Sequence, residues 1–202
     1  MNEQIQSELK KIYNSRYSIS ESTRATYSRG EDTYDPILSQ AVVFPETNEE
    51  VSKTLLLCNH HKVPVVPFGT GTSLEGNVVG NEEGITISLE KMNKILSVNV
   101  EDFDCRVQAC VTKEQLNEYL REDGVFFPID PGANAAIGGM ASTSASGTMA
   151  VKYGTMKTVI TGLTVVLPNG EIIRTGGRTK KTSAGYNLTN LFIGSEGTLG
   201  II

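Results

Sequence analysis

The 202-residue sequence predicts an α+β fold made of two small lobes. Three observations support this prediction. Apolar residues alternate with polar ones along several short stretches, as in strands, and recur at helical spacing in others. These stretches follow the order strand, helix, strand, then further strands, one helix and mixed β structure. Hydrophobic residues make up 39% of the chain and charged residues 20%, a composition typical of globular proteins.

The first 35 residues are expected to form a helical arm. They are polar, and their apolar residues Ile5, Leu9 and Ile12 have only a light helical periodicity. We therefore expect a peripheral arm over residues 1–35, followed by one domain over residues 36–202.

The first lobe is expected to open with a strand at 41–44. Thr47 and Glu50 then have the spacing of a helix-capping box. The helix that follows should end near His61 and bury the residues that fall on one of its faces: Val51, Thr54, Leu55 and Cys58. A strand at 63–66 comes next.

The following stretches, at 84–89 and 97–111, alternate well enough to be strands. Thr112 and Gln115 form a second capping box, and the helix behind it should end at Gly124. That helix carries three larger side chains on its apolar side: Leu116, Tyr119 and Leu120.

A hairpin over 163–174 is expected to turn on Pro168-Asn169-Gly170. With a seam near 95–105, the domain divides into two lobes, at about 36–98 and about 99–202.

The charge pattern argues against a nucleic-acid partner or an anionic membrane surface. The net charge is −5, and no run of Lys or Arg provides the basic face that such partners require. No apolar run approaches the ~18 residues of a membrane-spanning helix, and the first residues lack a signal pattern. We therefore expect a cytoplasmic protein without a transmembrane segment. Cys58, Cys105 and Cys110 lack CxxC spacing and are expected to be reduced thiols in packing roles.

The 20 glycines gather in three stretches, 69–84, 132–154 and 162–200, which indicates backbone that approaches a ligand. Backbone N–H groups, joined by Ser and Thr hydroxyls, can surround a pyrophosphate without a lysine. A nicotinamide-type motif is excluded by Leu74, which stands where the third glycine is required. The phosphate-binding GxxxxGK[ST] motif of kinases and ATPases is absent.

Five motifs occur in a fixed order along the chain: 67–76 (PFGTGTSLEG), 130–133 (DPGA), 137–140 (IGGM), 151–154 (VKYG) and 194–202 (GSEGTLGII). Together they resemble the FAD-binding domain shared by vanillyl-alcohol oxidase and p-cresol methylhydroxylase, in its 2-hydroxy-acid dehydrogenase branch. The resemblance spans about residues 36–202. It implies a two-lobed α+β domain of the p-cresol methylhydroxylase type.

The resemblance also implies the cofactor contacts. The first motif would hold the FAD pyrophosphate and its surroundings through Pro67, Gly69, Thr70, Gly71, Thr72 and Ser73. The tract at 130–154 would line the adenosine and the near edge of the flavin through Pro131, Gly132, Gly138, Gly139, Ser142, Ser146, Gly147 and Gly154. The closing motif would reach the adenine and ribose through Glu196, Gly197 and Ile202.

Some members of this superfamily attach FAD to a histidine in the first motif, where this chain has Thr72. The implication is non-covalent FAD. Two further positions depart from the branch: Asn77 replaces a frequent histidine, and Thr70 replaces a common glycine.

The implied reaction is oxidation of a small 2-hydroxy acid, of the glycolate or D-lactate type, to the 2-oxo acid, with electrons passing to a second acceptor. In this branch a further cap domain supplies the substrate-binding arginines and a metal site, and we expect that domain to lie outside this sequence. No catalytic residue and no metal ligand is therefore assigned. Two alternatives stay open: a FAD-binding module or subunit without catalysis of its own, and a related flavoenzyme such as an alkyl-glycerone-phosphate synthase or a sugar-lactone oxidase.

Three other polar groups have simple interpretations. His60 and His61 should cap a helix C-terminus, since a closed metal site needs about four ligands. The basic turn at 178–181 is more typical of a solvated turn than of a group that steers acidic substrates. Tyr186 is expected to pack against its apolar neighbours.

Overall fold

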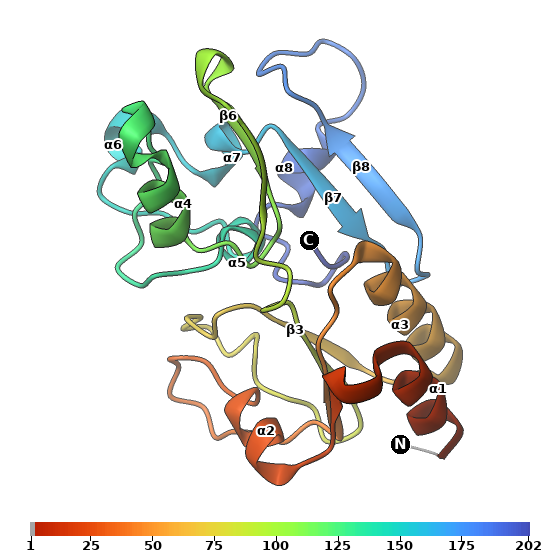
Figure 1. The fold of residues 1–202 in the computed structure, drawn as a ribbon. Helices are drawn as coiled ribbons and strands as arrows, with labels where there is room; N and C mark the ends of the chain where they lie inside the picture. The colour runs from red at the N-terminus through yellow and green to blue at the C-terminus, as the bar shows by residue number, and fades with distance from the viewer. Residues whose placement is uncertain (1–2) are drawn as a thin grey trace. The chain divides into compact units, whose positions relative to one another are not determined.

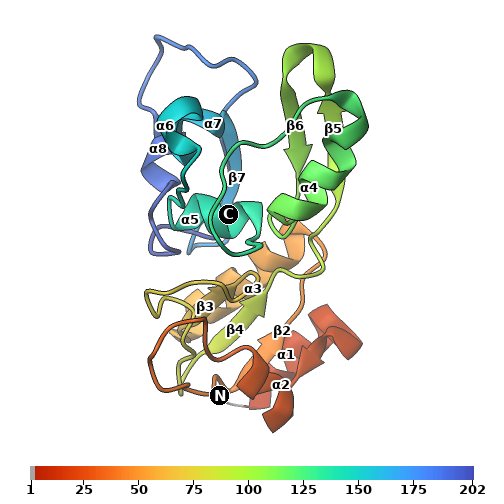
Figure 2. The same cartoon turned by 90° about the vertical axis from the view of Figure 1, so that its left-hand side faces the viewer.

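A computed structural model describes residues 3–202 and divides them into two compact units. The first unit contains the described residues up to Lys91, together with 166–172 and Ile201. The second contains Met92–Val165, Ile173–Gly200 and Ile202. Figures 1 and 2 together label most elements of both units.

The first unit is built on a four-stranded sheet with the strand order β1-β2-β4-β3. Its strands are β1 (Tyr17–Ser18), β2 (Ala41–Val43), β3 (Val65–Phe68) and β4 (Ile85–Ser88). β2, β3 and β4 are parallel, and β1 is antiparallel to β2. Pro67 pairs in register with Ile87 in the edge strand β3, where the missing N–H of proline is tolerated.

The predicted helix of this unit is confirmed as α3 (Asn48–His61). The Thr47 side chain accepts a hydrogen bond from the Glu50 N–H at 3.2 Å, which caps the helix as the sequence predicts. α1 (Glu3–Tyr13) packs against α3, and the Tyr13 hydroxyl meets the Thr54 hydroxyl at 2.6 Å in the buried contact between them. Burial raises the pKa of Tyr13, so this buried hydroxyl stays neutral. α2 (Glu21–Thr26) is a short helix before β2.

The second unit begins with an antiparallel hairpin of β5 (Ile95–Asn99) and β6 (Asp104–Val107). The prediction of one strand over 97–111 is therefore wrong: the chain reverses through a 3-10 turn and Phe103, which has a left-handed φ of 53°. α4 (Lys113–Leu120) follows, and Thr112 accepts a hydrogen bond from the Gln115 N–H at 3.1 Å, as predicted.

Short helices and a second hairpin complete this part of the chain: α5 (Ile137–Ser142), α6 (Ala150–Tyr153), α7 (Met156–Val159), β7 (Gly162–Val166), β8 (Ile172–Gly176) and α8 (Leu188–Phe192). The predicted hairpin is confirmed, because Gly170 donates to the Leu167 carbonyl at 2.8 Å with a positive φ of 83°. The core of the second unit gathers around α4, α5 and α7, with Leu116, Ile129, Met140 and Met156 fully buried.

The division into an arm over residues 1–35 and two lobes, at about 36–98 and about 99–202, stays a prediction. In the structure, α1 and β1 belong to the same compact unit as β2, and that unit gives way to the second between Lys91 and Met92.

Candidate cofactor-binding site

The loop between β3 and β4, residues 69–84, contains a left-handed glycine followed by residues with unbonded N–H groups, and is called the β3–β4 loop below. Gly71 lies in the left-handed region at φ +72°. Within residues 3–202, the backbone N–H groups of Gly71, Thr72 and Ser73 donate no hydrogen bond. Successive free N–H groups at such a turn form a concavity for phosphate oxygens. This segment therefore fits the pyrophosphate of FAD.

Gly71 is required by its neighbours as well as by its φ angle. A Cβ atom at this position would lie 2.8 Å from Cζ of Phe68, whose buried side chain ends β3. Packing against Phe68 therefore requires glycine at this position, in addition to the close approach of a ligand that we expect there.

Hydroxyl groups of the same loop have partners within it. The Thr70 and Thr72 hydroxyl oxygens lie 3.3 Å apart, and the Ser73 hydroxyl donates to the side-chain oxygen of Asn77. Asn77, which stands where the 2-hydroxy-acid dehydrogenase branch often has histidine, therefore stabilises the loop by an internal hydrogen bond. The N–H of Ser73, rather than its hydroxyl, is the group left for a ligand.

In the second unit, the Asp130 carboxylate links the 130–133 motif to Thr148 and Met149. One carboxylate oxygen accepts the Met149 N–H at 2.9 Å, and the other accepts the Thr148 hydroxyl at 2.8 Å. The Met149 N–H above all, helped by Thr148, lowers the pKa of Asp130. Gly147 lies so close to the Asp130 carbonyl that a Cβ atom would collide with it. The structure therefore brings the 130–133 motif against residues 147–149.

The closing motif lies against the C-terminal end of α5. Gly194 donates to the Ala141 carbonyl at 3.0 Å, and Glu196 donates to the Ser142 carbonyl at 2.9 Å. Glu196 and Gly197 both have positive φ angles, 52° and 79°. Backbone hydrogen bonds thus join the closing motif to the two residues that directly follow the 137–140 motif, more than fifty residues earlier in the chain.

Sequence reasoning missed Ser195 in the same segment. Its side chain is 9% exposed, and its hydroxyl has no hydrogen-bond partner among residues 3–202. A buried polar group without a partner is costly, so this hydroxyl is a further candidate to contact a ligand or a water molecule. The available sequence signal was its place in the closing motif, between Gly194 and Gly197.

The remaining predicted residues differ in what surrounds them. Gly138 is buried, and a Cβ atom there would lie 2.6 Å from the Ala109 Cβ, so packing alone requires glycine. Gly154 needs glycine for its φ of 87° and for its contact with Thr158. The predicted residues on or near the surface are Pro131, Gly132, Gly139 and Ser146. Ile202 packs against the core of the second unit.

The basic turn at 178–181 is held by two ion pairs of Arg178. Arg178 donates to Asp104 at 2.7 Å and to Asp102 at 2.6 Å, which holds its guanidinium at the end of the β5–β6 hairpin. The expectation that Tyr186 packs is wrong for the described residues, because its side chain is 94% exposed.

The histidines lie at the C-terminal end of α3, with ring centroids 4.8 Å apart. Among residues 3–202, no group of three His, Cys, Asp or Glu side chains could hold a metal ion. Burial raises the pKa of the Cys58 thiol to about 12, which keeps it a neutral packing residue. No helix in the described part of the chain is long and apolar enough to cross a membrane.

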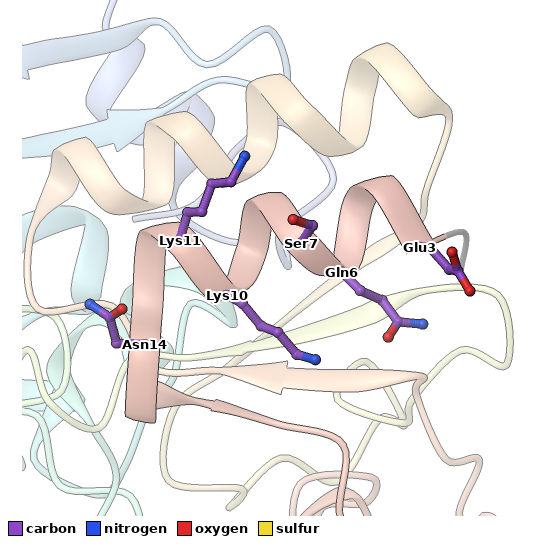
Figure 3. Close-up of a pocket in the computed structure, with 6 residues that line it drawn as sticks. All are labelled: Glu3, Gln6, Ser7, Lys10, Lys11 and Asn14. Atoms are coloured by element: carbon purple, nitrogen blue, oxygen red, sulfur yellow. The ribbon is translucent and has the colours of Figure 1, made fainter.

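A surface hollow of about 560 Å³ lies beside α1 and is shown in Figure 3. All of its lining side chains come from α1 or the turn behind it: Glu3, Gln6, Ser7, Lys10, Lys11 and Asn14. These residues are remote in sequence from every glycine-rich motif, and the hollow has no part in the predicted cofactor site.

Comparison with known proteins identifies the family. The model of the FAD binding domain matches residues 39–176. The chain is 50% identical over 188 residues to a probable mitochondrial D-lactate dehydrogenase of Danio rerio, covering 92% of this chain and 38% of the relative. It is 39% identical over 181 residues to the glycolate oxidase subunit GlcD of Bacillus subtilis, covering 89% of this chain and 38% of that protein. The chain therefore spans little more than a third of the length of these relatives.

Solved structures support the fold. An alkyldihydroxyacetonephosphate synthase superposes with a TM-score of 0.87 at 24% identity, over 100% of this chain and 39% of that chain. Substrate-bound p-cresol methylhydroxylase superposes with a TM-score of 0.79 at 22% identity, over 98% of this chain and 41% of that chain. The α+β fold of the p-cresol methylhydroxylase type that the motifs predicted is thereby confirmed. With the family model covering most of its length, this chain belongs to the FAD-binding domain family.

Proposed function

We propose that this chain holds FAD non-covalently and forms the cofactor-binding part of a flavoenzyme that oxidises a small 2-hydroxy acid to the 2-oxo acid. The observation that carries the cofactor proposal is the run of free N–H groups at Gly71, Thr72 and Ser73. Three N–H groups can meet the pyrophosphate oxygens without a cationic side chain.

The residues proposed to contact FAD fall into two groups. The β3–β4 loop and the strand before it provide Pro67, Gly69, Thr70, Gly71, Thr72 and Ser73. The second unit provides Pro131, Gly132, Gly138, Gly139, Ser142, Ser146, Gly147, Gly154, Glu196, Gly197 and Ile202. When bound, FAD supplies the two-electron oxidation, while the protein binds and orients it.

The reaction proposed is of the D-lactate or glycolate type. Its support is the identity of 50% and 39% with proteins described as a D-lactate dehydrogenase and a glycolate oxidase subunit. A hydroxy acid and a second electron acceptor are then the expected partners of the complete enzyme. A cytoplasmic location is proposed from the sequence alone; the named relatives include mitochondrial and bacterial proteins.

Titration of the purified chain with FAD and with NAD tests the cofactor proposal. We expect saturable binding of FAD and none of NAD. Acid precipitation of the FAD-loaded chain should leave the yellow flavin in the supernatant, because Thr72 offers no ring nitrogen for a covalent bond. Yellow colour that stays with the washed pellet would contradict non-covalent binding, and equal affinity for NAD would contradict the cofactor assignment.

A further inference from the structure

The segment that follows α2, residues 28–39, lies along the β3–β4 loop within the first unit. Both ends of this segment meet the same end of the loop: the Ser28 carbonyl accepts the Gly80 N–H at 3.2 Å, and the Ser39 hydroxyl accepts the Asn81 N–H at 3.2 Å. Figures 1 and 2 show the two segments side by side, one orange and one yellow. The 28–39 segment therefore forms a closed loop against the loop that we assign to the pyrophosphate.

The middle of the 28–39 segment contacts the glycine-rich part of the β3–β4 loop directly. Glu31 donates its N–H to the Ser73 carbonyl at 3.0 Å. Gly30 lies so close that a Cβ atom would be 2.5 Å from the same carbonyl oxygen. Farther along, the Tyr34 ring covers Gly76, where a Cβ atom would lie 2.6 Å from the ring. These contacts hold the Ser73 carbonyl group in place. The N–H group of the same residue is one of the three that donate no hydrogen bond within residues 3–202.

Asp32 determines the shape of the contacting turn. One carboxylate oxygen accepts the Gly30 N–H at 3.1 Å, and the other accepts the Tyr34 N–H at 3.0 Å. The Asp32 side chain therefore fixes Gly30 and Tyr34, which both contact the β3–β4 loop. Glu31, whose N–H binds the Ser73 carbonyl, lies between these two residues. A side chain that bridges its own backbone in this way stabilises a tight turn.

We propose that Asp32 is a positioning residue for FAD: it holds the 28–39 segment in the conformation that keeps the β3–β4 loop ready to bind the pyrophosphate. This proposal rests on the proposed function. Asp32 acts through Glu31 and Ser73 and does not itself contact the cofactor. Preorganisation of this kind strengthens binding because the loop has less conformational freedom left to lose.

The sign of the effect separates positioning from simple electrostatics. A carboxylate near an anion site repels the anion, so removing a negative charge there should strengthen pyrophosphate binding. Asp35 is the matched control, because it is exposed on the same segment and makes no hydrogen bond or ion pair with the described residues. We expect Asp35→Ala to bind FAD as tightly as the parent or slightly more tightly. Asp32→Ala loses both hydrogen bonds to the turn and should bind FAD about tenfold more weakly, because part of their stabilisation must then be supplied on binding.

Titrations of the full 202-residue chain with FAD and with ADP, which contains the same pyrophosphate, measure these effects. Asp32→Asn should lie between the parent and Asp32→Ala, because the amide oxygen can accept only one of the two N–H groups. Hydrogen exchange in the ligand-free chain should be faster in Asp32→Ala at residues 28–34 and 71–80, with the rest unchanged.

Each outcome bears on one proposal. If the parent fails to bind FAD, the proposed function is wrong. If the parent binds and Asp32→Ala matches Asp35→Ala for both FAD and ADP, the positioning role of Asp32 is wrong. Loss of the folded circular dichroism in Asp32→Ala would also overturn it, since Asp32 would then be a determinant of the whole fold.

Discussion

The hydrogen bonds that Asp130 accepts from residues 148 and 149 depend on its ionisation and therefore on pH. Because the Met149 N–H and the Thr148 hydroxyl favour the ionised carboxylate, the pKa of Asp130 is lower in the folded chain than in an unfolded one. Its stabilising effect is fully present above the unfolded value of about 3.9 and is lost as the pH falls through the lower folded pKa. The contact between residues 130–133 and 147–149 should therefore weaken only in acid.

This leads to a prediction about FAD affinity at low pH. In the parent chain, affinity should hold down to the unfolded value of about 3.9 and fall as the pH passes through the lower folded pKa of Asp130. The fall should be less steep in Asp130→Asn, because the neutral amide does not titrate. The amide oxygen can still accept the Met149 N–H, so Asp130→Asn should bind FAD nearly as well as the parent at pH 7. Equilibrium dialysis from pH 7 to about pH 3, with circular dichroism to confirm folding, measures both profiles. Superimposable profiles would contradict a role for Asp130.

At the scale of single elements, the two adjacent glycines of α5 allow packing to be separated from ligand contact. Gly138→Ala should lower the free energy of unfolding by about 1–3 kcal/mol, because its Cβ would meet the Ala109 backbone and side chain. Gly139→Ala should leave it unchanged or raise it by up to about 1 kcal/mol, because the nearest atom is 4.0 Å away and alanine favours helix.

The same pair tests the cofactor assignment of Gly139, which is exposed on α5. We expect Gly139→Ala to weaken FAD binding although it does not destabilise the chain. Urea unfolding and FAD titration of both variants provide the two measurements. Unchanged FAD affinity in Gly139→Ala would remove Gly139 from the proposed contacts.

Elements with a local signal could be predicted from the sequence, and those that depend on distant contacts could not. Thr47 and Thr112 cap their helices as their spacing predicts, because a capping box involves only neighbouring residues. The β5–β6 hairpin was missed because its reversal passes through Phe103, which carries no glycine or Asn-Gly signal.

The candidate site shows the same limit. The motifs predicted the glycine-rich walls, whereas nothing local to Asp32 predicted that its turn would meet Ser73, forty-one residues farther along the chain. The prediction that Tyr186 packs was wrong for a related reason, since apolar neighbours in the sequence do not by themselves bury an aromatic ring. Long-range pairing depends on tertiary contacts that no single window contains.

At the scale of the whole molecule, binding FAD and oxidising a hydroxy acid are separable tasks. A carboxylate substrate must be held beside the flavin by a cationic group, with a proton acceptor shielded from water. Arg178 is engaged by Asp102 and Asp104, and the two histidines lie at the end of α3. The chain also spans only 38% of the length of the D-lactate dehydrogenase relative from Danio rerio.

We therefore predict that the 202-residue chain, saturated with FAD, does not reduce an artificial electron-accepting dye in the presence of D-lactate or glycolate. The measurement is anaerobic dye reduction with both enantiomers of lactate and with glycolate. Dithionite-reduced, FAD-loaded chain is the control, and it should transfer its electrons to the dye, because an accessible flavin needs no substrate site for that step. Saturable and stereospecific dye reduction by any of these acids would mean that this chain already contains a complete substrate site, and the separation of the two tasks would be wrong.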